Sequence, residues 1–160
     1  MEKMLKITAV LAIIAGILMI GVSAYAIMFT YNNVIRENIT TPADASIPSA
    51  PVRGPFTLKA QADIIRKHAL KASDGKTYAQ MPSKVPQLDE NGDPVLDENG
   101  EAVMVSNSAR TTWVTATTLI TALNLGVLTY AFSALVFFLG LISVWTGVTF
   151  YVLSRRYKTA

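Results

Sequence analysis

Two long runs of uncharged, mostly apolar residues constrain this chain more than any other feature. The first run, residues 7–29, contains 23 residues without a charge or a proline. A helix of this length extends about 35 Å, which exceeds the roughly 30 Å hydrocarbon core of a bilayer. A helix in the core of a soluble domain usually keeps one polar face, and this segment has none. The run therefore predicts a transmembrane helix.

The second run, residues 126–153, is uncharged over 28 residues and stops just before Arg155 and Arg156. Aromatic residues typical of a membrane interface lie near that end: Trp145, Tyr151 and Tyr157. No proline follows residue 94, so a single helix can begin near Ala109 and continue to Leu153. We interpret its threonine-rich first part, residues 111–124, as an extension outside the hydrocarbon or a tilted entry to the span.

Composition agrees with a small membrane protein and excludes several kinds of site. Apolar residues make up 51% of the chain and charged residues 16%. The absence of cysteine excludes disulfides, thiolate metal sites and a cysteine nucleophile. The single histidine excludes an iron site with two histidine ligands within one chain. We therefore expect an all-α membrane protein with no catalytic residue, no metal and no cofactor.

The distribution of charge predicts the topology. Five of the 14 basic residues lie at the two ends of the chain: Lys3, Lys6, Arg155, Arg156 and Lys158. The positive-inside rule then places both termini in the cytoplasm of a protein that crosses the cell membrane twice. The expected segments are a cytoplasmic start and first span (1–29), an extracytoplasmic region (30–110), a long helix with the second span (111–153) and a basic cytoplasmic tail (154–160).

A cleaved signal peptide is the alternative for the N-terminal run. Lys3 and Lys6 would form its basic region, residues 7–22 its apolar region, and residues 24–26 (Ala-Tyr-Ala) its cleavage site. The apolar run continues past that site to Phe29, which favours a retained span. N-terminal sequencing of the mature protein distinguishes the two.

Small residues in both spans are candidates for helix packing. Lipid provides no hydrophobic force between helices, so close backbone approach through small side chains is the usual route to association. The first span offers Ala9, Ala12, Gly16 and Ser23, and the second offers Gly140, Ser143 and Gly147. Ala12 with Gly16, Gly140, and Ser143 with Gly147 are the main candidates. They could face one another within one chain or form the seam of a dimer. Neither span contains an ionisable residue, which argues against a proton relay or an ion pathway.

The extracytoplasmic region is expected to contain a short amphipathic helix and a small β-meander. Residues 57–73 have apolar residues at helical spacing, with Thr57 as the expected N-cap and Gly75 as a stop. We favour packing of this helix on residues 111–124 over a position on the outer leaflet. Residues 88–95 and 96–103 are near-duplicates with Asn-Gly pairs, which predict type I′ turns between strands near 84–89, 93–97 and 101–106. Their acidic residues do not match a calcium-binding loop, because glycine falls at the wrong position.

Residues 51–81, PVRGPFTLKAQADIIRKHALKASDGKTYAQM, together with the flanking spans resemble a group of small two-pass actinobacterial membrane proteins of unknown function. The resemblance implies that this block is an interaction element. Its candidate contact residues are Arg53, Gly54, Pro55, Phe56, Gln61, Ile65, His68, Lys76 and Tyr78. Members of the group often carry the label "aromatic ring-opening dioxygenase, small subunit". Extradiol cleavage needs iron held by two histidines and a carboxylate, and His68 is the one histidine of this chain.

These features favour a non-enzymatic integral membrane protein with an extracytoplasmic interaction loop. No nucleophile, base and oxyanion donors recur at a spacing that suggests a catalytic site. An accessory subunit of a membrane enzyme or transporter is the alternative, followed by a dioxygenase-associated small subunit. The expected partners are the lipid bilayer and another membrane protein or a second copy of the chain. No basic stripe for nucleic acid and no small-molecule substrate is evident.

Overall fold

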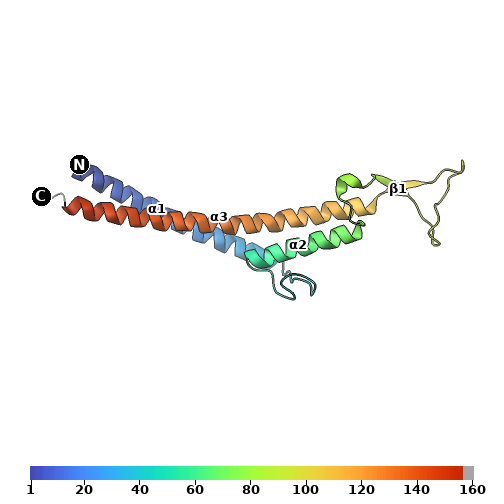
Figure 1. Cartoon of the computed structure of the whole chain (residues 1–160), viewed down its shortest axis with the longest axis horizontal. Coiled ribbons are helices and arrows are strands. Elements are labelled where there is room, and N and C mark those ends of the chain that lie inside the picture. The colour runs from blue at the N-terminus through green and yellow to red at the C-terminus, as the bar shows by residue number, and fades with distance from the viewer. Residues whose placement is uncertain (157–160) are drawn as a thin grey trace.

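The computed structural model describes residues 1–156, which form an elongated molecule built around two long antiparallel helices (Figure 1). Helix α1 covers Glu2–Arg36 and helix α3 covers Ser108–Arg156. A shorter helix, α2, covers Pro55–Ala72. It packs on the first half of α3, whereas α1 packs on the second half. The start of α1 and the end of α3 lie at the same end of the molecule. Both α1 and α3 are long and apolar enough to cross a membrane.

Helix α3 is a single helix of 49 residues, as its proline-free sequence predicted. At 1.5 Å per residue it extends about 73 Å, more than twice the thickness of the hydrocarbon core. Helix α1 continues to Arg36, seven residues beyond the end of the predicted first span at Phe29. Thr30 and Asn33 bond carbonyl oxygens one turn earlier in the helix, at 2.9 and 2.8 Å. The helix also passes without a break through residues 24–26, the alternative cleavage site.

The contact between α1 and α3 is made by small residues that recur every seven positions. Its buried members are Ala9, Gly16, Ser23 and Thr30 in α1 and Ser133, Gly140, Gly147 and Ser154 in α3. A seven-residue repeat keeps one stripe of each helix facing the other in a left-handed supercoil. The large apolar side chains point outward, with Leu18 62% exposed and Phe132 64% exposed. A soluble coiled coil has the reverse order, with large side chains inside the seam.

Helix α2 begins two residues earlier than predicted, and its N-cap is Gly54 rather than Thr57. Pro55 occupies the first helical position, where its missing N–H costs nothing. The Thr57 hydroxyl oxygen instead accepts hydrogen bonds from the backbone N–H groups of Arg53 and Gly54, at 3.0 and 3.2 Å. The threonine therefore fixes the chain as it enters the helix, although it lies one turn further along.

Helix α2 packs on the first half of α3, which confirms the packing favoured from the sequence. One apolar cluster joins Val52, Leu58 and Ala62 to Leu123 of α3, and Val34 of α1 packs against it. A second cluster further along joins Ala69 and Met81 to Trp113 and Ala116. Together the clusters turn this part of the molecule into a stalk, defined here as α2 and residues 108–125 of α3.

The far end of the stalk carries a small β structure, called the tip here (residues 84–106). Its sheet has two strands, β1 (Lys84–Pro86) and β2 (Met104–Ser106), which pair antiparallel. The predicted third strand at 93–97 does not form, and only isolated bridges Leu88–Pro94 and Leu96–Ala102 flank the turns. Pro94 lacks an N–H for a ladder and prevents a regular strand at this position. A three-residue 3₁₀ turn, η1 (Tyr78–Gln80), connects α2 to the tip.

The duplicated segments form two matching hairpins around a central set of backbone hydrogen bonds. Gln87 donates to Val103, Val103 to Val95, and Val95 to Gln87, each at 2.8 Å. Each hairpin turns through an i to i+3 bond, Gly92 N–H to Asp89 O at 3.1 Å and Gly100 N–H to Asp97 O at 3.0 Å. The predicted type I′ turns are wrong, because only the glycines, with φ of 90° and 80°, have positive φ in these turns. The geometry is a type I turn followed by a left-handed glycine.

Candidate functional site

The five packing candidates meet at the contact between α1 and α3 of the same chain. A Cβ atom added to Gly16 would lie 2.6 Å from the carbonyl oxygen of Gly140, and one added to Gly147 would lie 2.7 Å from that of Ala9. The Ser143 hydroxyl donates a 2.8 Å hydrogen bond to the carbonyl oxygen of Ala12. The two backbones are therefore in direct contact, which only glycine permits at these positions.

Sequence reasoning missed Thr30, Ser133 and Ser154, which are buried in this contact together with Ala9 and Ser23. Three of the hydroxyls donate to carbonyls of their own helix: Ser23 to Ile20, Thr30 to Ala26, and Ser154 to Tyr151. The seven-residue spacing of small residues would have identified the whole set, because it continues beyond the four-residue pairs considered from the sequence.

The nine candidate contact residues of the 51–81 block do not form one surface. Gly54 and Pro55 start α2, and Ile65 packs against both apolar clusters of the stalk. The ring of Tyr78 lies under the guanidinium group of Arg110, which is 4.0 Å from its centroid. Much of the block therefore packs within the chain. Phe56, His68 and Lys76 are exposed, and Gln61 has a buried Oε1 with no hydrogen-bond partner among residues 1–156.

The Arg53 backbone is tied to α3. Its carbonyl oxygen accepts a 3.1 Å hydrogen bond from the hydroxyl of Tyr130. Leu58, one turn into α2, has a methyl group 3.1 Å from the position that a Cβ on Gly126 would occupy. The start of α2 is thus fixed beside residues 126–130, where the predicted second span (126–153) begins.

His68 binds the loop that connects α1 to α2. Its Nε2 atom lies 2.9 Å from Asp44 Oδ2, and Lys67 Nζ lies 3.6 Å from the same oxygen. The hydrogen bond to His68 is the main cause that lowers the pKa of Asp44 below its ordinary value of 3.8. No sequence pattern linked residues 44 and 68, because Asp44 lies in an irregular loop and His68 lies in α2, 24 residues later. The pair is half-exposed, so it acts as a surface tether for the loop.

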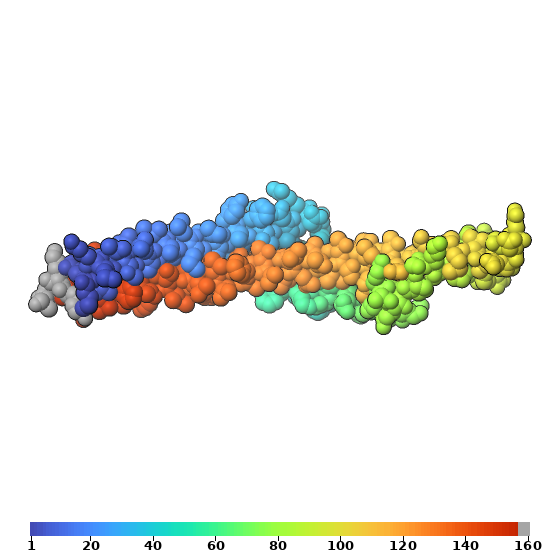
Figure 2. Space-filling model, turned by 90° about the horizontal axis from the view of Figure 1, so that it is seen from above, coloured from blue at the N-terminus to red at the C-terminus, as the bar shows by residue number. Residues whose placement is uncertain are grey.

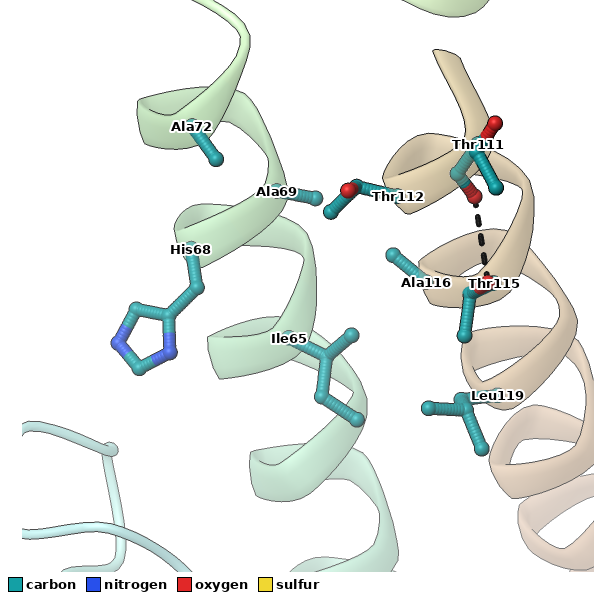
Figure 3. Close-up of a pocket in the computed structure, with 9 residues that line it drawn as sticks. All are labelled: Ile65, His68, Ala69, Ala72, Thr111, Thr112, Thr115, Ala116 and Leu119. Carbon is teal, nitrogen blue, oxygen red and sulfur yellow. Dashed lines mark hydrogen bonds between the residues drawn. The ribbon is translucent and has the colours of Figure 1, made fainter. Parts of the chain in front are cut away.

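A shallow groove of about 460 Å³ lies between α2 and α3, and His68 stands at its edge (Figure 3). Ile65, Ala69 and Ala72 line one side, and Ala116, Leu119 and three threonines line the other. The Thr115 hydroxyl donates to Thr111 O of its own helix at 3.2 Å, so it is not directed at a ligand. Within residues 1–156, no three His, Cys, Asp or Glu side chains are grouped as metal ligands.

The tip exposes two leucines at equivalent positions of the duplication, in a segment that also carries carboxylates. Leu88 is 58% exposed and Leu96 is 60% exposed. The Asp89 carboxylate accepts bonds from the backbone N–H groups of Asn91 and Asp93, both at 2.9 Å, and the Asp97 carboxylate is held in the same way. The bond from the Asp93 N–H is the main cause that lowers the pKa of Asp89. These aspartates are therefore structural parts of the turns.

No protein-family model, curated protein sequence or solved structure matches this chain significantly. The resemblance to actinobacterial two-pass membrane proteins consequently remains a hypothesis from residues 51–81.

Proposed function

We propose that this chain is a non-enzymatic membrane protein that crosses the cell membrane twice, keeps both ends in the cytoplasm and presents the tip to a partner protein outside. The observation that carries the proposal is the inverted distribution of side-chain size along α1 and α3. Small residues fill the contact between the helices, and large apolar residues cover the outside. This order suits a lipid environment, where close packing rather than hydrophobic burial holds helices together.

The apolar outer surface of α1 and α3 would be unfavourable in water. A large aliphatic or aromatic side chain left in water forgoes about 1.5–3 kcal/mol of burial free energy. Both helices expose such residues on every side that does not face the other helix, among them Leu11, Ile14, Leu18, Phe29, Leu128, Phe132, Phe138 and Ile142. A monomeric soluble protein rarely exposes so continuous an apolar surface.

The charges and the lengths of the helices define where the bilayer lies. The basic residues at the shared end of α1 and α3 favour the cytoplasmic side. If the hydrocarbon covers residues 7–29 and 126–153, the part of α3 before residue 126 extends about 27 Å beyond it at 1.5 Å per residue. Figure 2 shows the tip beyond this stalk, at the far end from the start of α1. The stalk therefore acts as a spacer between the membrane and the tip.

The tip is the part of the protein that best suits a partner. Leu88 and Leu96 supply apolar contact area, and the same segment carries six carboxylates (Asp89, Glu90, Asp93, Asp97, Glu98 and Glu101). A partner with apolar contacts inside a basic rim has the complementary chemistry. The proposed partner is another protein on the outer face of the membrane.

Site-specific photo-crosslinking in intact cells tests this proposal. A photoreactive residue at 88 or at 96 should give the same adduct, since the duplication places both leucines in equivalent surroundings. Reversal of the neighbouring charges by Glu90→Lys and Glu98→Lys should reduce that adduct. The matched control is the photoreactive residue at Thr118 on the stalk, which is also exposed. Equal adducts from 118, or an adduct insensitive to charge reversal, would contradict tip docking.

A further inference from the structure

Phe56 is an exposed aromatic residue outside both apolar runs. It lies in the first turn of α2 and is 80% exposed, although its neighbour Leu58 is 1% exposed. The ring makes no contribution to either apolar cluster of the stalk. Its position therefore needs an explanation other than packing within the chain.

The contacts of α2 place Phe56 at the depth where the second span begins. Arg53 is bonded to the hydroxyl of Tyr130, and Leu58 contacts the backbone at Gly126. Phe56 lies between these two anchor points in the sequence. Residues 126–130 are the first residues of the predicted second span (126–153), so this depth corresponds to the outer boundary of the hydrocarbon in the proposed membrane arrangement.

The direction of α2 points the side chain of Phe56 toward the bilayer. The helix starts beside residues 126–130 and ends near Trp113, so its N-terminus faces the spans (Figure 1). Each Cα–Cβ bond in an α-helix tilts toward the N-terminus of the helix. The first turn has no preceding helical turn to cover the ring, which agrees with the 80% exposure of Phe56.

We propose that Phe56 inserts into the outer leaflet and that Arg53 beside it binds the lipid phosphates, so that the start of α2 fixes the depth of the stalk. Aromatic rings are favoured at the boundary between headgroups and acyl chains, and a guanidinium group matches a phosphate. The apolar surface of the spans would continue onto Phe56 without a break. This inference rests on the proposed membrane insertion, and the occupant of the surface is the lipid itself.

Quenching by brominated lipids tests the inference. The chain has two tryptophans, Trp113 in the stalk and Trp145 in the second span. In a Trp113→Phe, Trp145→Phe background, Phe56→Trp should lose emission in vesicles of phosphatidylcholine brominated on its acyl chains. The matched control, Lys71→Trp in the last turn of α2, should keep its emission. Equal quenching of the Phe56→Trp and Lys71→Trp variants would overturn the inference.

A third variant separates this inference from the proposed function. Trp145 alone, in a Trp113→Phe background, should be quenched because it lies within the span. If it is quenched and Phe56→Trp is not, the spans are inserted and the outer-leaflet anchor is wrong. If Trp145 is not quenched either, the membrane proposal itself fails, and the anchor with it.

A second measurement keeps both native tryptophans, so that loss of the Trp113 packing cannot confuse the result. Phe56→Cys with a nitroxide label, in a chain that has no other cysteine, should collide more with oxygen than with a water-soluble nickel chelate. The same label at Lys71→Cys should show the reverse preference. A label at 56 that prefers the nickel chelate would contradict insertion.

Discussion

At the scale of single residues, the contact between α1 and α3 depends on glycines, which have no side chain. Gly16, Gly140 and Gly147 allow the backbones of α1 and α3 to touch, and a single methyl group at Gly16 would overlap backbone atoms of the opposite helix. Ser143 adds one hydrogen bond between the helices, to the carbonyl of Ala12. Bonds of this kind between membrane helices contribute about 0.6 kcal/mol each. Most of the association therefore comes from close packing.

Alanine substitutions at two glycines of the same helix should have opposite effects. Gly16→Ala places a Cβ 2.6 Å from Gly140 O and 2.8 Å from Val144 N, and these backbone atoms cannot move away without separating the helices. We expect a loss of about 1–3 kcal/mol, typical of overpacking. Gly21→Ala meets nothing within 4 Å and should be neutral or stabilising by up to about 1 kcal/mol, from helix propensity.

The difference between the two alanine variants can be measured by circular dichroism during unfolding in mixed micelles. Equal stability of the two variants would show that the helices do not meet at Gly16.

The tether between Asp44 and His68 should be visible in a titration. The hydrogen bond to His68 favours the charged carboxylate, so the pKa of Asp44 in the folded chain lies below 3.8. The stabilising contribution is present above that ordinary value and is lost as the pH falls through the lowered pKa. In His68→Ala the pKa of Asp44 should rise toward 3.8. Lys67→Ala should produce a smaller rise, because the charge of Lys67 is the weakest of the causes.

Carboxyl-detected NMR provides the measurement for Asp44. An unchanged pKa of Asp44 in His68→Ala would show that His68 does not tether the loop to α2.

At the scale of elements, regular patterns were predictable and junctions were not. The uncharged runs and the absence of proline indicated both long helices, and the apolar spacing of residues 57–73 indicated α2 and its packing face. The continuation of α1 to Arg36 was missed because the apolar run that predicted the helix ends at Phe29, although Thr30 and Asn33 bond back to their own helix. The bond from Tyr130 to Arg53 joins residues far apart in the sequence, so local patterns carry no information about it.

In the tip, too, some features were predictable from the sequence and others were not. The duplication predicted two matching turns, and the positions of Gly92 and Gly100 predicted where they occur. The predicted turn type was wrong because the carboxylates of Asp89 and Asp97 accept from the N–H groups two residues later, and Asn91 and Asn99 do not take the positive φ that a type I′ turn requires. The central triangle of bonds among Gln87, Val95 and Val103 depends on all three chain passages together.

Packing of α2 on α3 should depend strongly on Leu58. This side chain is 1% exposed, and Leu58→Ala should cost about 2–5 kcal/mol of stalk stability. Leu125→Ala is the matched control, because Leu125 lies in the stalk part of α3, is 58% exposed and does not line the groove between α2 and α3. Emission of Trp113, which is buried under α2, reports undocking in a Trp145→Phe background. Release of Trp113 at the same denaturant concentration in both variants would show that Leu58 does not hold α2.

At the scale of the whole molecule, one long helix connects the contact with α1 to the tip. Helix α3 begins in the stalk and ends beside the start of α1, so a single rigid element links the tip to the opposite end (Figure 1). The predicted basic tail lies partly in residues 157–160, outside the described residues, while Arg155 and Arg156 end α3. The central claim is that this element and α1 cross the bilayer together and leave the tip outside.

Cysteine labelling in intact cells tests that claim most directly, because the chain has no native cysteine. Single cysteines are introduced by Ser83→Cys next to the tip, and by Lys3→Cys and Arg156→Cys at the shared end of α1 and α3. A membrane-impermeant maleimide should label position 83 in intact cells, and positions 3 and 156 only after lysis. Labelling of positions 3 and 83 from the same side before lysis, or a mature chain that lacks position 3, would contradict two crossings with both ends in the cytoplasm.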